Sequence, residues 1–324
     1  MCSAAVHNAS LSDLSDFADL IRRYPFKRFQ QAIQGIDKDR LNAYLIGALE
    51  ASLREEGAMA WLARIGGRCA AGAVVSPNPW HSGFYDMNMA RCSTFLNYAR
   101  PAEAGPALIG AILDGARARG CRHLSVRIDG DDYPSLRQLE AAGFRLIDCS
   151  LKLAARIAAE PPAESPGMAV RAFRPEDREA VLRIAESCHP RNHFYNDPQL
   201  DRERTDRLFR AWVDRCLEGL AKRVFVAENA DGVQGFVAYL ANRALNEALG
   251  LSLAVLDYIA LDTHAQGRGL GYELMSRSLR ALAGEFDQVE LRTSQNNYPA
   301  LACYAKYGFR IAASDFILHR SIEE

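Results

Sequence analysis

Apolar residues follow two kinds of spacing along the chain. Spacings of three and four positions predict helices over Ser12–Arg23, Asp37–Glu55, Pro106–Arg119, Pro175–Glu186, Arg202–Leu217 and Tyr272–Ala283. Short apolar runs, several of them rich in β-branched residues, predict strands over Ala58–Ile65, Cys69–Val75, Val224–Ala227, Val233–Leu240 and Leu253–Leu261. Strands and helices mixed in this way indicate an α/β (α+β) fold with a mixed sheet.

One segment without an apolar pattern separates the chain into halves of similar size. Ala158–Gly167 reads AAEPPAESPG, and its three prolines exclude a helix interior and a central strand. We therefore predict a domain at 1–157 that carries an N-terminal helical extension, a linker at 158–167 and a second domain at 168–324.

The two halves repeat one pattern. When the second half is shifted by 165 positions, seven of nineteen ungapped residues from Arg127 to Arg145 are identical to their counterparts. Both segments read as strand, polar turn, helix opened by proline, glycine stop and strand. The halves are therefore predicted to be two copies of one α/β unit.

A glycine-rich loop, Gln266–Gly271 (QGRGLG), lies between the strand ending at Leu261 and a helix. A strand, glycine turn and helix in this order present free backbone N–H groups and a positive dipole end to a phosphate. Tyr272 and Leu274 stand where a dinucleotide fingerprint needs its third glycine, and no P-loop motif occurs. Taken alone, the loop fits an ordinary glycine-rich turn equally well.

A second motif follows at Asn297–Phe309, which reads NYPALACYAKYGF. Asn297, Ala300 and Tyr304 share one helix face, and the small Ala300 leaves space beside the Tyr304 hydroxyl. A buried core tyrosine is the simpler interpretation of Tyr304.

Together the two motifs, QxxGxG after a strand and NxxAxxxYxxxGF, resemble the signature blocks of the GNAT superfamily of acyl-CoA N-acyltransferases, over about 168–320. The resemblance implies that acetyl-CoA is the co-substrate, without a metal, and that Tyr304 is the general acid near the sulfur. It further implies cofactor contacts from Ile259, Ala260, Leu261, Gln266, Gly267, Arg268, Gly269, Leu270, Gly271 and Asn297.

Acyl transfer to an amine requires a neutral amine, a stabilised carbonyl oxygen and a proton for the departing thiolate. A phenol with a pKa of ~10 keeps its proton at neutral pH and can donate a strengthening hydrogen bond to the sulfur. Asp257 is the candidate base, because strand alternation places it on the face of Ile259, although a structural hydrogen-bond acceptor is the favoured interpretation. Cys303 is discounted as a nucleophile, because it points about 100° away from Tyr304 around the helix.

The first half lacks both motifs at the shifted positions. Leu139 stands in place of Tyr304, Asp132 in place of Asn297, and Ala104 and Pro106 in place of the loop glycines. We predict a degenerate GNAT-like unit that keeps the fold without a working cofactor site and helps to shape an acceptor pocket.

The acceptor remains open between several alternatives. Arg191–Leu200 and Trp80–Tyr85 resemble segments of dTDP-fucosamine acetyltransferase relatives, which implies a nucleotide-linked amino sugar and substrate contacts from His193, Phe194 and Tyr195. These aromatic residues also fit a core or an interface. A mycothiol-synthase-like enzyme acting on a cysteinyl amine fits the length, and a non-catalytic acetyl-CoA-binding regulator is the third alternative. An intact Tyr304 argues against the regulator.

Composition narrows the remaining classes. Apolar residues make up 49% and charged residues 24%, and the net charge is −1, which gives no footprint for nucleic acid or a membrane surface. Eight single cysteines without paired spacing, and no signal or membrane-spanning run, favour the cytoplasm. His189 and His193 lack a third ligand nearby, so no metal site is predicted. We expect a small-molecule amine as the partner, and a monomer or homodimer.

Overall fold

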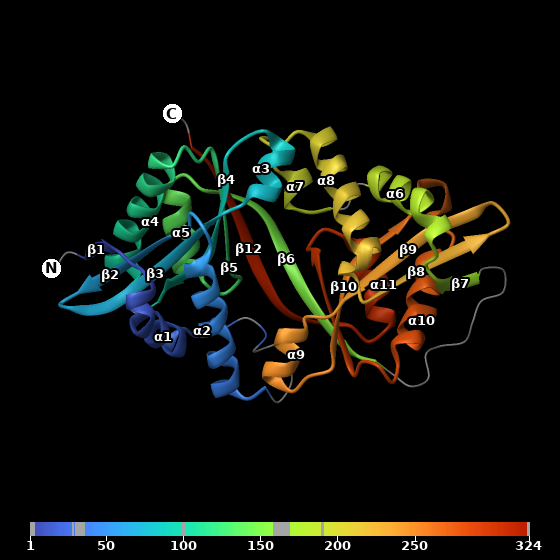
Figure 1. The fold of residues 1–324 in the computed structure, drawn as a ribbon, viewed down its shortest axis with the longest axis horizontal. Helices are drawn as coiled ribbons and strands as arrows, with labels where there is room; N and C mark the ends of the chain where they lie inside the picture. Colours follow the sequence, from blue (N-terminus) through green and yellow to red (C-terminus); the bar gives the residue numbers. More distant parts are fainter. Residues whose placement is uncertain are drawn as a thin grey trace. The chain divides into compact units, whose positions relative to one another are not determined.

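Helices and strands are mixed throughout the part of the chain that the computed structural model describes, residues 4–27, 29, 36–98, 101–157, 169–188 and 191–322 (Figure 1). The chain divides into two units, the first made of Met1–Ser150 and Ala313–Glu324 and the second of Leu151–Ala312. The predicted linker Ala158–Gly167 lies outside the described residues. Within the described ranges, no helix has the length and apolar character needed to cross a membrane.

The sheet of the first unit has the strand order β1-β2-β3-β4-β5-β12. Its strands are β1 (Ala5–Asn8), β2 (Met59–Ile65), β3 (Arg68–Pro77), β4 (Met89–Asn97), β5 (His123–Asp129) and β12 (Arg310–Ser321). Its helices are α1 (Leu14–Arg23), α2 (Lys38–Arg54), α3 (Pro79–Tyr85), α4 (Pro101–Ala118) and α5 (Tyr133–Ala141). Helices α4 and α5 bury apolar residues on one face of the sheet, and α1 and α2 do so on the other.

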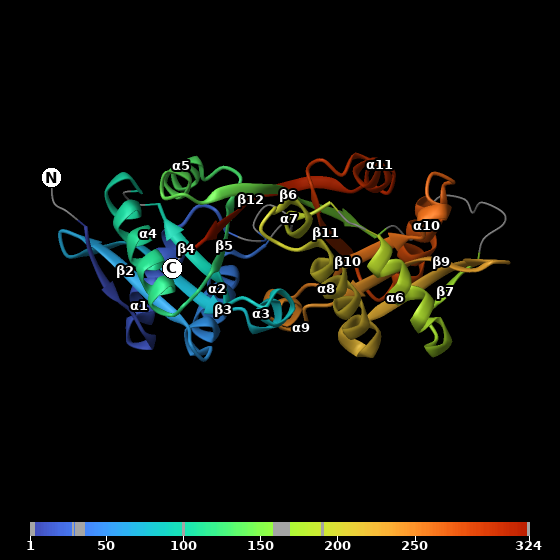
Figure 2. The same cartoon turned by 90° about the horizontal axis from the view of Figure 1, so that it is seen from above.

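The sheet of the second unit has the order β6-β11-β10-β9-β8-β7. Its strands are β6 (Arg145–Arg156), β7 (Ala169–Ala172), β8 (Arg223–Asn229), β9 (Gly232–Leu240), β10 (Leu253–Leu261) and β11 (Gln288–Ser294). Its helices are α6 (Arg178–Ser187), α7 (His193–Asn196), α8 (Arg202–Arg215), α9 (Arg243–Leu249), α10 (Leu270–Leu282) and α11 (Tyr298–Lys306). Helices α10 and α11 cover one face, and α6 and α8 cover the other (Figure 2).

Each unit receives its last strand from the other half of the chain. The C-terminal strand β12 pairs antiparallel with β5, with Phe316 opposite Ile128. Strand β6, which ends the first half, lies beside β11 in the second unit. The prediction of two consecutive domains did not include this exchange of strands, because strand partners far apart in sequence leave no local signal.

The repeat seen in the sequence is also a repeat of structure. A shift of 165 positions places β11 on β5, α11 on α5 and β12 on β6, with the same first and last residues in each pair. Predicted and observed boundaries differ most at helix α4, which begins at Pro101, five residues before the predicted start at Pro106. The apolar pattern missed this extension because its residues, Pro-Ala-Glu-Ala-Gly, offer few large apolar side chains. The short helices α3, α7 and α9 were not predicted either.

Candidate functional site

Strands β10 and β11 separate partway along their length. Their pairing extends from Leu253 opposite Gln288 to Leu256 opposite Leu291. Beyond this point β10 continues along β9 to Leu261, so within the described residues its other edge has no strand partner over 258–261. An unpaired strand edge is where an extended ligand can bind through backbone hydrogen bonds. The predicted cofactor contacts Ile259, Ala260 and Leu261 lie on this segment.

A β-bulge at Asp257 marks the point of separation. Along β9, Leu256 lies opposite Tyr239 and Tyr258 lies opposite Ala238, which leaves Asp257 as the extra residue. The bulge reverses the alternation: Leu256 and Ile259 pack in the same apolar cluster as Tyr304, and Tyr258 packs in the cluster on the opposite face.

The Asp257 side chain consequently points away from the face predicted for it. Its Oδ2 accepts a hydrogen bond of 2.6 Å from the Trp212 indole nitrogen and lies 3.9 Å from the Cys216 Sγ, both on the α8 side of the sheet. Burial raises the pKa of the Asp257 carboxyl. The prediction that Asp257 shares the face of Ile259 was therefore wrong, because it assumed an unbroken period of two.

The glycine-rich loop leaves its backbone amides available. Gly267 and Gly269 have φ values of 77° and 82°, which residues other than glycine rarely adopt, and Gly269 is the N-cap residue of α10. Within the described residues, the N–H groups from Gly267 to Gly271 donate no hydrogen bond to the chain, while the Gln266 side chain donates to the Leu261 carbonyl at 3.3 Å. The loop from Gln266 to Gly269, including Arg268, is exposed. Such a cluster of free donors at a helix start suits a phosphate.

Gly271 differs from the other two loop glycines. Its φ is not positive, and an added Cβ would lie 3.6 Å from the Leu261 Cδ1, an ordinary contact. Neither the backbone nor the packing of the chain requires glycine here. A ligand that approaches the backbone closely would require glycine at this position.

Asn297 lies at the start of α11, and Thr293 holds its side chain in place. Its Nδ2 donates to the Thr293 Oγ1 at 2.9 Å, and its backbone carbonyl accepts from the Leu301 amide at 2.9 Å. Its side chain does not cap the helix, and its Oδ1 accepts no hydrogen bond from the described residues. The Asn297 oxygen is therefore available to a ligand.

Tyr304 combines a buried ring with an unused hydroxyl. Its side chain is 4% exposed and packs against Phe309, with ring centroids 5.7 Å apart. Among the described residues the hydroxyl has no hydrogen-bond partner, and burial raises its pKa above the ordinary value of 10.0, so it keeps its proton. The neighbouring Tyr307 hydroxyl donates to the Tyr272 carbonyl at 2.5 Å, which fixes α11 against α10.

The first unit fills the corresponding region with its own side chains. Leu139, buried at the position of Tyr304, has no hydroxyl. Asn97 at the end of β4 donates to Gln138 of α5 at 2.9 Å and lies 3.4 Å from the Ser135 hydroxyl. The first turn of α4 occupies the sequence positions of the glycine loop, so its residues are helical rather than open. Tyr24 donates to Asp132 at 3.0 Å beside this network.

The predicted substrate residues His193, Phe194 and Tyr195 form the short helix α7. The Tyr195 ring stacks on Phe209 of α8 at 5.6 Å, and its hydroxyl donates to Asp206 at 2.6 Å. The rings of His193 and Phe194 lie 4.1 Å apart. The three side chains are only partly buried, and the rings of Phe194 and Tyr195 contact Phe209 of α8. His189 lies outside the described residues.

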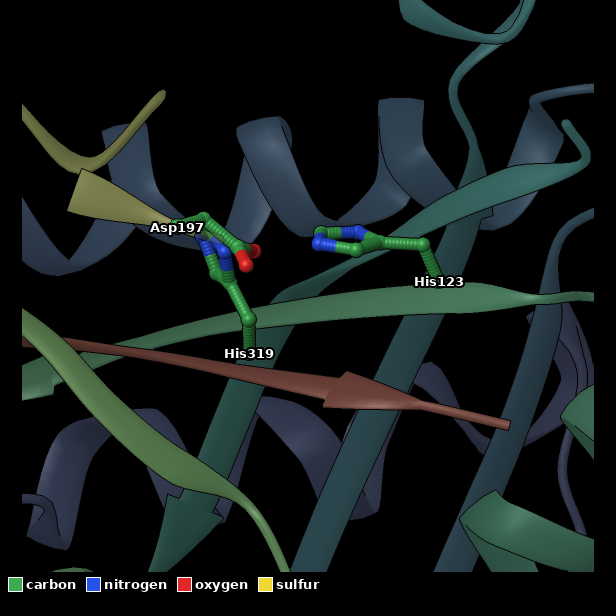
Figure 3. A group of neighbouring side chains, drawn as sticks. All are labelled: His123, Asp197 and His319. Atoms are coloured by element: carbon green, nitrogen blue, oxygen red, sulfur yellow. The ribbon is translucent and has the colours of Figure 1, made fainter. Parts of the chain in front are cut away.

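Two features of the structure had no counterpart in the predictions. The exchanged strand β12 brings His319 to His123 of β5, with ring centroids 4.7 Å apart (Figure 3). In the second unit, Lys152 of β6 and Glu290 of β11 form a buried ion pair. The signal for the second was present in the sequence, since Lys152 and Glu290 are charged residues with an apolar residue on either side.

Comparisons with known proteins agree with this arrangement. A family model described as an acetyltransferase (GNAT) domain matches residues 221–311. A mycothiol acetyltransferase of Kineococcus radiotolerans is 31% identical over 226 residues, 65% of this chain and 65% of that protein. Its namesake in Clavibacter michiganensis is 30% identical over 233 residues, 68% of this chain and 69% of the relative. The chain thus spans slightly less than two thirds of the first relative.

A tandem GNAT protein from the clavulanic acid biosynthesis pathway, solved without acetyl-CoA, has a similar fold. It superimposes with a TM-score of 0.58 at 16% identity, over 99% of each chain. At this identity the likeness concerns the fold alone, and it supports two GNAT-like units in one chain, as the internal repeat predicted.

Proposed function

Because the chain belongs to the GNAT superfamily of acyl-CoA N-acyltransferase enzymes, we propose that it transfers an acetyl group from acetyl-CoA to a primary amine of a small molecule. The observation that carries the proposal is the set of unused polar groups in the second unit. These are the free amides of the glycine loop, the open edge of β10, the Asn297 oxygen and the Tyr304 hydroxyl. Together they fit the pyrophosphate, the pantetheine arm and the sulfur of acetyl-CoA.

Each group has a distinct task in this proposal. The amides of Gly267–Gly271, with the exposed Arg268, bind the pyrophosphate, and the Ile259–Leu261 backbone pairs with the pantetheine amides. Tyr304 donates its proton to the thiolate as the carbon–sulfur bond breaks. Its raised pKa keeps the phenol protonated, and the apolar surroundings strengthen the hydrogen bond to a developing negative charge.

The proposed acceptor is the cysteinyl amine of a mycothiol precursor. Both curated relatives described above are named mycothiol acetyltransferases, and they supply the support for this choice. The comparisons give no support to the resemblance to dTDP-fucosamine acetyltransferases. The nucleotide-linked amino sugar therefore enters the test as a competing acceptor.

The test measures acetyl transfer by the full chain to cysteinamide, cysteinyl glucosamine and dTDP-4-amino-4,6-dideoxygalactose. Free CoA is quantified by chromatography, because the cysteinyl acceptors carry thiols that interfere with thiol reagents, and mass spectrometry identifies the acetylated product. N-acetylation of the cysteinyl compounds, lost in Tyr304→Phe, supports the proposal. Transfer to the sugar nucleotide alone would change the acceptor, and acetyl-CoA binding without transfer to any amine would favour the regulator.

The degenerate first unit leads to a further expectation about binding. Since Asn97, Ser135 and Gln138 fill its corresponding region, we expect one acetyl-CoA per chain in calorimetric titration. A stoichiometry of two would contradict this description of the first unit.

A further inference from the structure

The second unit contains a buried carboxylate that the proposed reaction has not yet used. Glu290 of β11 is 7% exposed and Lys152 of β6 is 3% exposed. The Lys152 Nζ lies 3.8 Å from the Glu290 Oε2, beyond hydrogen-bond distance. Among the described residues this buried oxygen has no hydrogen-bond partner.

An ion pair of this kind is poorly explained by stability alone. Burying two charges carries a desolvation penalty that is recovered only when hydrogen bonds satisfy the charged atoms. One carboxylate oxygen of Glu290 lacks such a bond. An apolar pair of similar size would fill the same space without this cost, so the carboxylate is better explained by a ligand that it binds.

The position of Glu290 fits a role at the reaction centre. Val289 and Leu291, on either side of it, pack in the same apolar cluster as Tyr304, so Glu290 faces the other side of the sheet. In the parallel register Glu290 lies opposite Val255, next to the last paired position before β10 and β11 separate. A ligand reaching the thioester from the side opposite Tyr304 would meet Glu290 at the start of this gap.

We propose that Glu290 binds the acceptor's amino group and is the general base of the acetyl transfer, an inference that rests on the proposed function. The amine nitrogen forms a bond to the thioester carbonyl carbon, and the proton that it loses passes to the Glu290 carboxylate. The carbon–sulfur bond then breaks, and the thiolate takes the Tyr304 proton. The products are the acetamide and free CoA, and exchange with water returns both residues to their initial states.

Asp257, the base candidate of the sequence, is less suited to this role. Its Oδ2 is already engaged by the Trp212 indole at 2.6 Å. Its neighbour Cys216 lies close to the same oxygen. Asp257 is therefore a structural acceptor on the α8 side in this proposal.

The experiment compares Glu290→Gln, Lys152→Met and the double variant in the full chain. Glutamine keeps the size of the side chain and removes its charge, and methionine does the same for lysine. For each variant, acetyl-CoA affinity is measured by calorimetry, thermal unfolding by circular dichroism, and kcat and KM for cysteinyl glucosamine by chromatography of CoA. We expect Glu290→Gln to lower kcat/KM about 10²- to 10⁴-fold, with acetyl-CoA affinity within twofold of the parent chain.

The double variant separates a catalytic from a structural role. If Glu290 only neutralises Lys152, removing both charges restores folding and activity together, and this outcome overturns the proposal. If Glu290 is the base, the double variant folds and binds acetyl-CoA, yet its kcat/KM is about 10²- to 10⁴-fold below that of the parent chain. This comparison holds even where Glu290→Gln alone fails to fold.

The two levels of the argument fail in different ways. An active parent chain with an equally active Glu290→Gln variant would overturn the role of Glu290 and leave the proposed function standing. A parent chain that acetylates no amine in the panel would overturn both.

Discussion

Removal of a single hydroxyl from Tyr304 is the sharpest test of the candidate site. In Tyr304→Phe the aromatic ring, which packs against Phe309 at 5.7 Å, is unchanged. Within the described residues the lost hydroxyl forms no hydrogen bond in the chain, so no internal bond is broken. Because no internal hydrogen bond is lost and the ring stays in place, we expect the variant to be as stable as the parent chain.

The catalytic effect should be large in comparison. A general acid contributes about 10²- to 10⁴-fold to the rate. We allow from tenfold upward, because a phenol is a weaker acid than a thiol and burial, which raises the Tyr304 pKa, makes full proton transfer to the thiolate more uphill. A loss of 10- to 10⁴-fold in kcat equals roughly 1.4–5.5 kcal/mol of transition-state stabilisation. Affinity for acetyl-CoA should change little, since its pyrophosphate and pantetheine contacts come from the loop and from β10.

The assay measures kcat from CoA release, acetyl-CoA affinity by calorimetry and the melting temperature for the same preparation. Tyr298→Phe is the matched control, because Tyr298 starts the same helix but is 69% exposed. An unchanged kcat in Tyr304→Phe, with normal product formation, would refute the assignment of the acid. A large loss of melting temperature would refute the claim that the hydroxyl has no structural bond.

Three further expectations test other parts of the structure. Gly271→Ala should keep or slightly raise stability and weaken acetyl-CoA binding at least tenfold. Gly269→Ala should weaken binding and also lower stability by about 1 kcal/mol, because Gly269 has a φ of 82°. Equal binding in calorimetry and equal melting temperatures for the two variants would contradict this expectation. Asp257→Asn should keep kcat within threefold, since the amide oxygen still accepts from Trp212. Because burial raises the Asp257 pKa, the contribution of Asp257 to stability is complete below the unfolded pKa of ~3.9 and is lost as pH rises through the folded pKa. The melting temperature of the asparagine variant should therefore rise relative to that of the parent chain as the pH increases. A hundredfold loss of kcat would restore Asp257 as the base. Burial, with a further effect from the nearby Arg91, lowers the pKa of His81 to about 4. Denaturant titrations should therefore show that stability decreases as the pH falls from ~6.5 to the folded pKa. His81→Gln should make stability depend less on pH over this range. A pH dependence that His81→Gln leaves unchanged would assign it to other groups.

Much of the candidate site could be predicted because its signals are local. Gly267 and Gly269 do have the positive φ that a tight turn before a helix demands, and Tyr304 does lie on a helix that begins after Asn297. These are properties of short segments, set by sterics and helix geometry within a few residues. The prediction for Asp257 failed for the same reason. One inserted residue in β10 shifts the alternation of side chains between the two faces, and no local residue pattern predicts the bulge.

The sequence by itself determined the longer helices, most of the strands, the internal repeat and the two motifs. Helical and strand periodicity, proline and glycine punctuation and the shift of 165 positions all depend on neighbours along the chain. Only the tertiary structure decided which strands lie side by side: β12 beside β5 in the first unit and β6 beside β11 in the second. It also placed Glu290 next to the point where β10 and β11 separate. The physical reason is that strand pairing and burial of charge depend on residues distant in sequence, whose hydrogen bonds and desolvation are fixed only when the sheet forms.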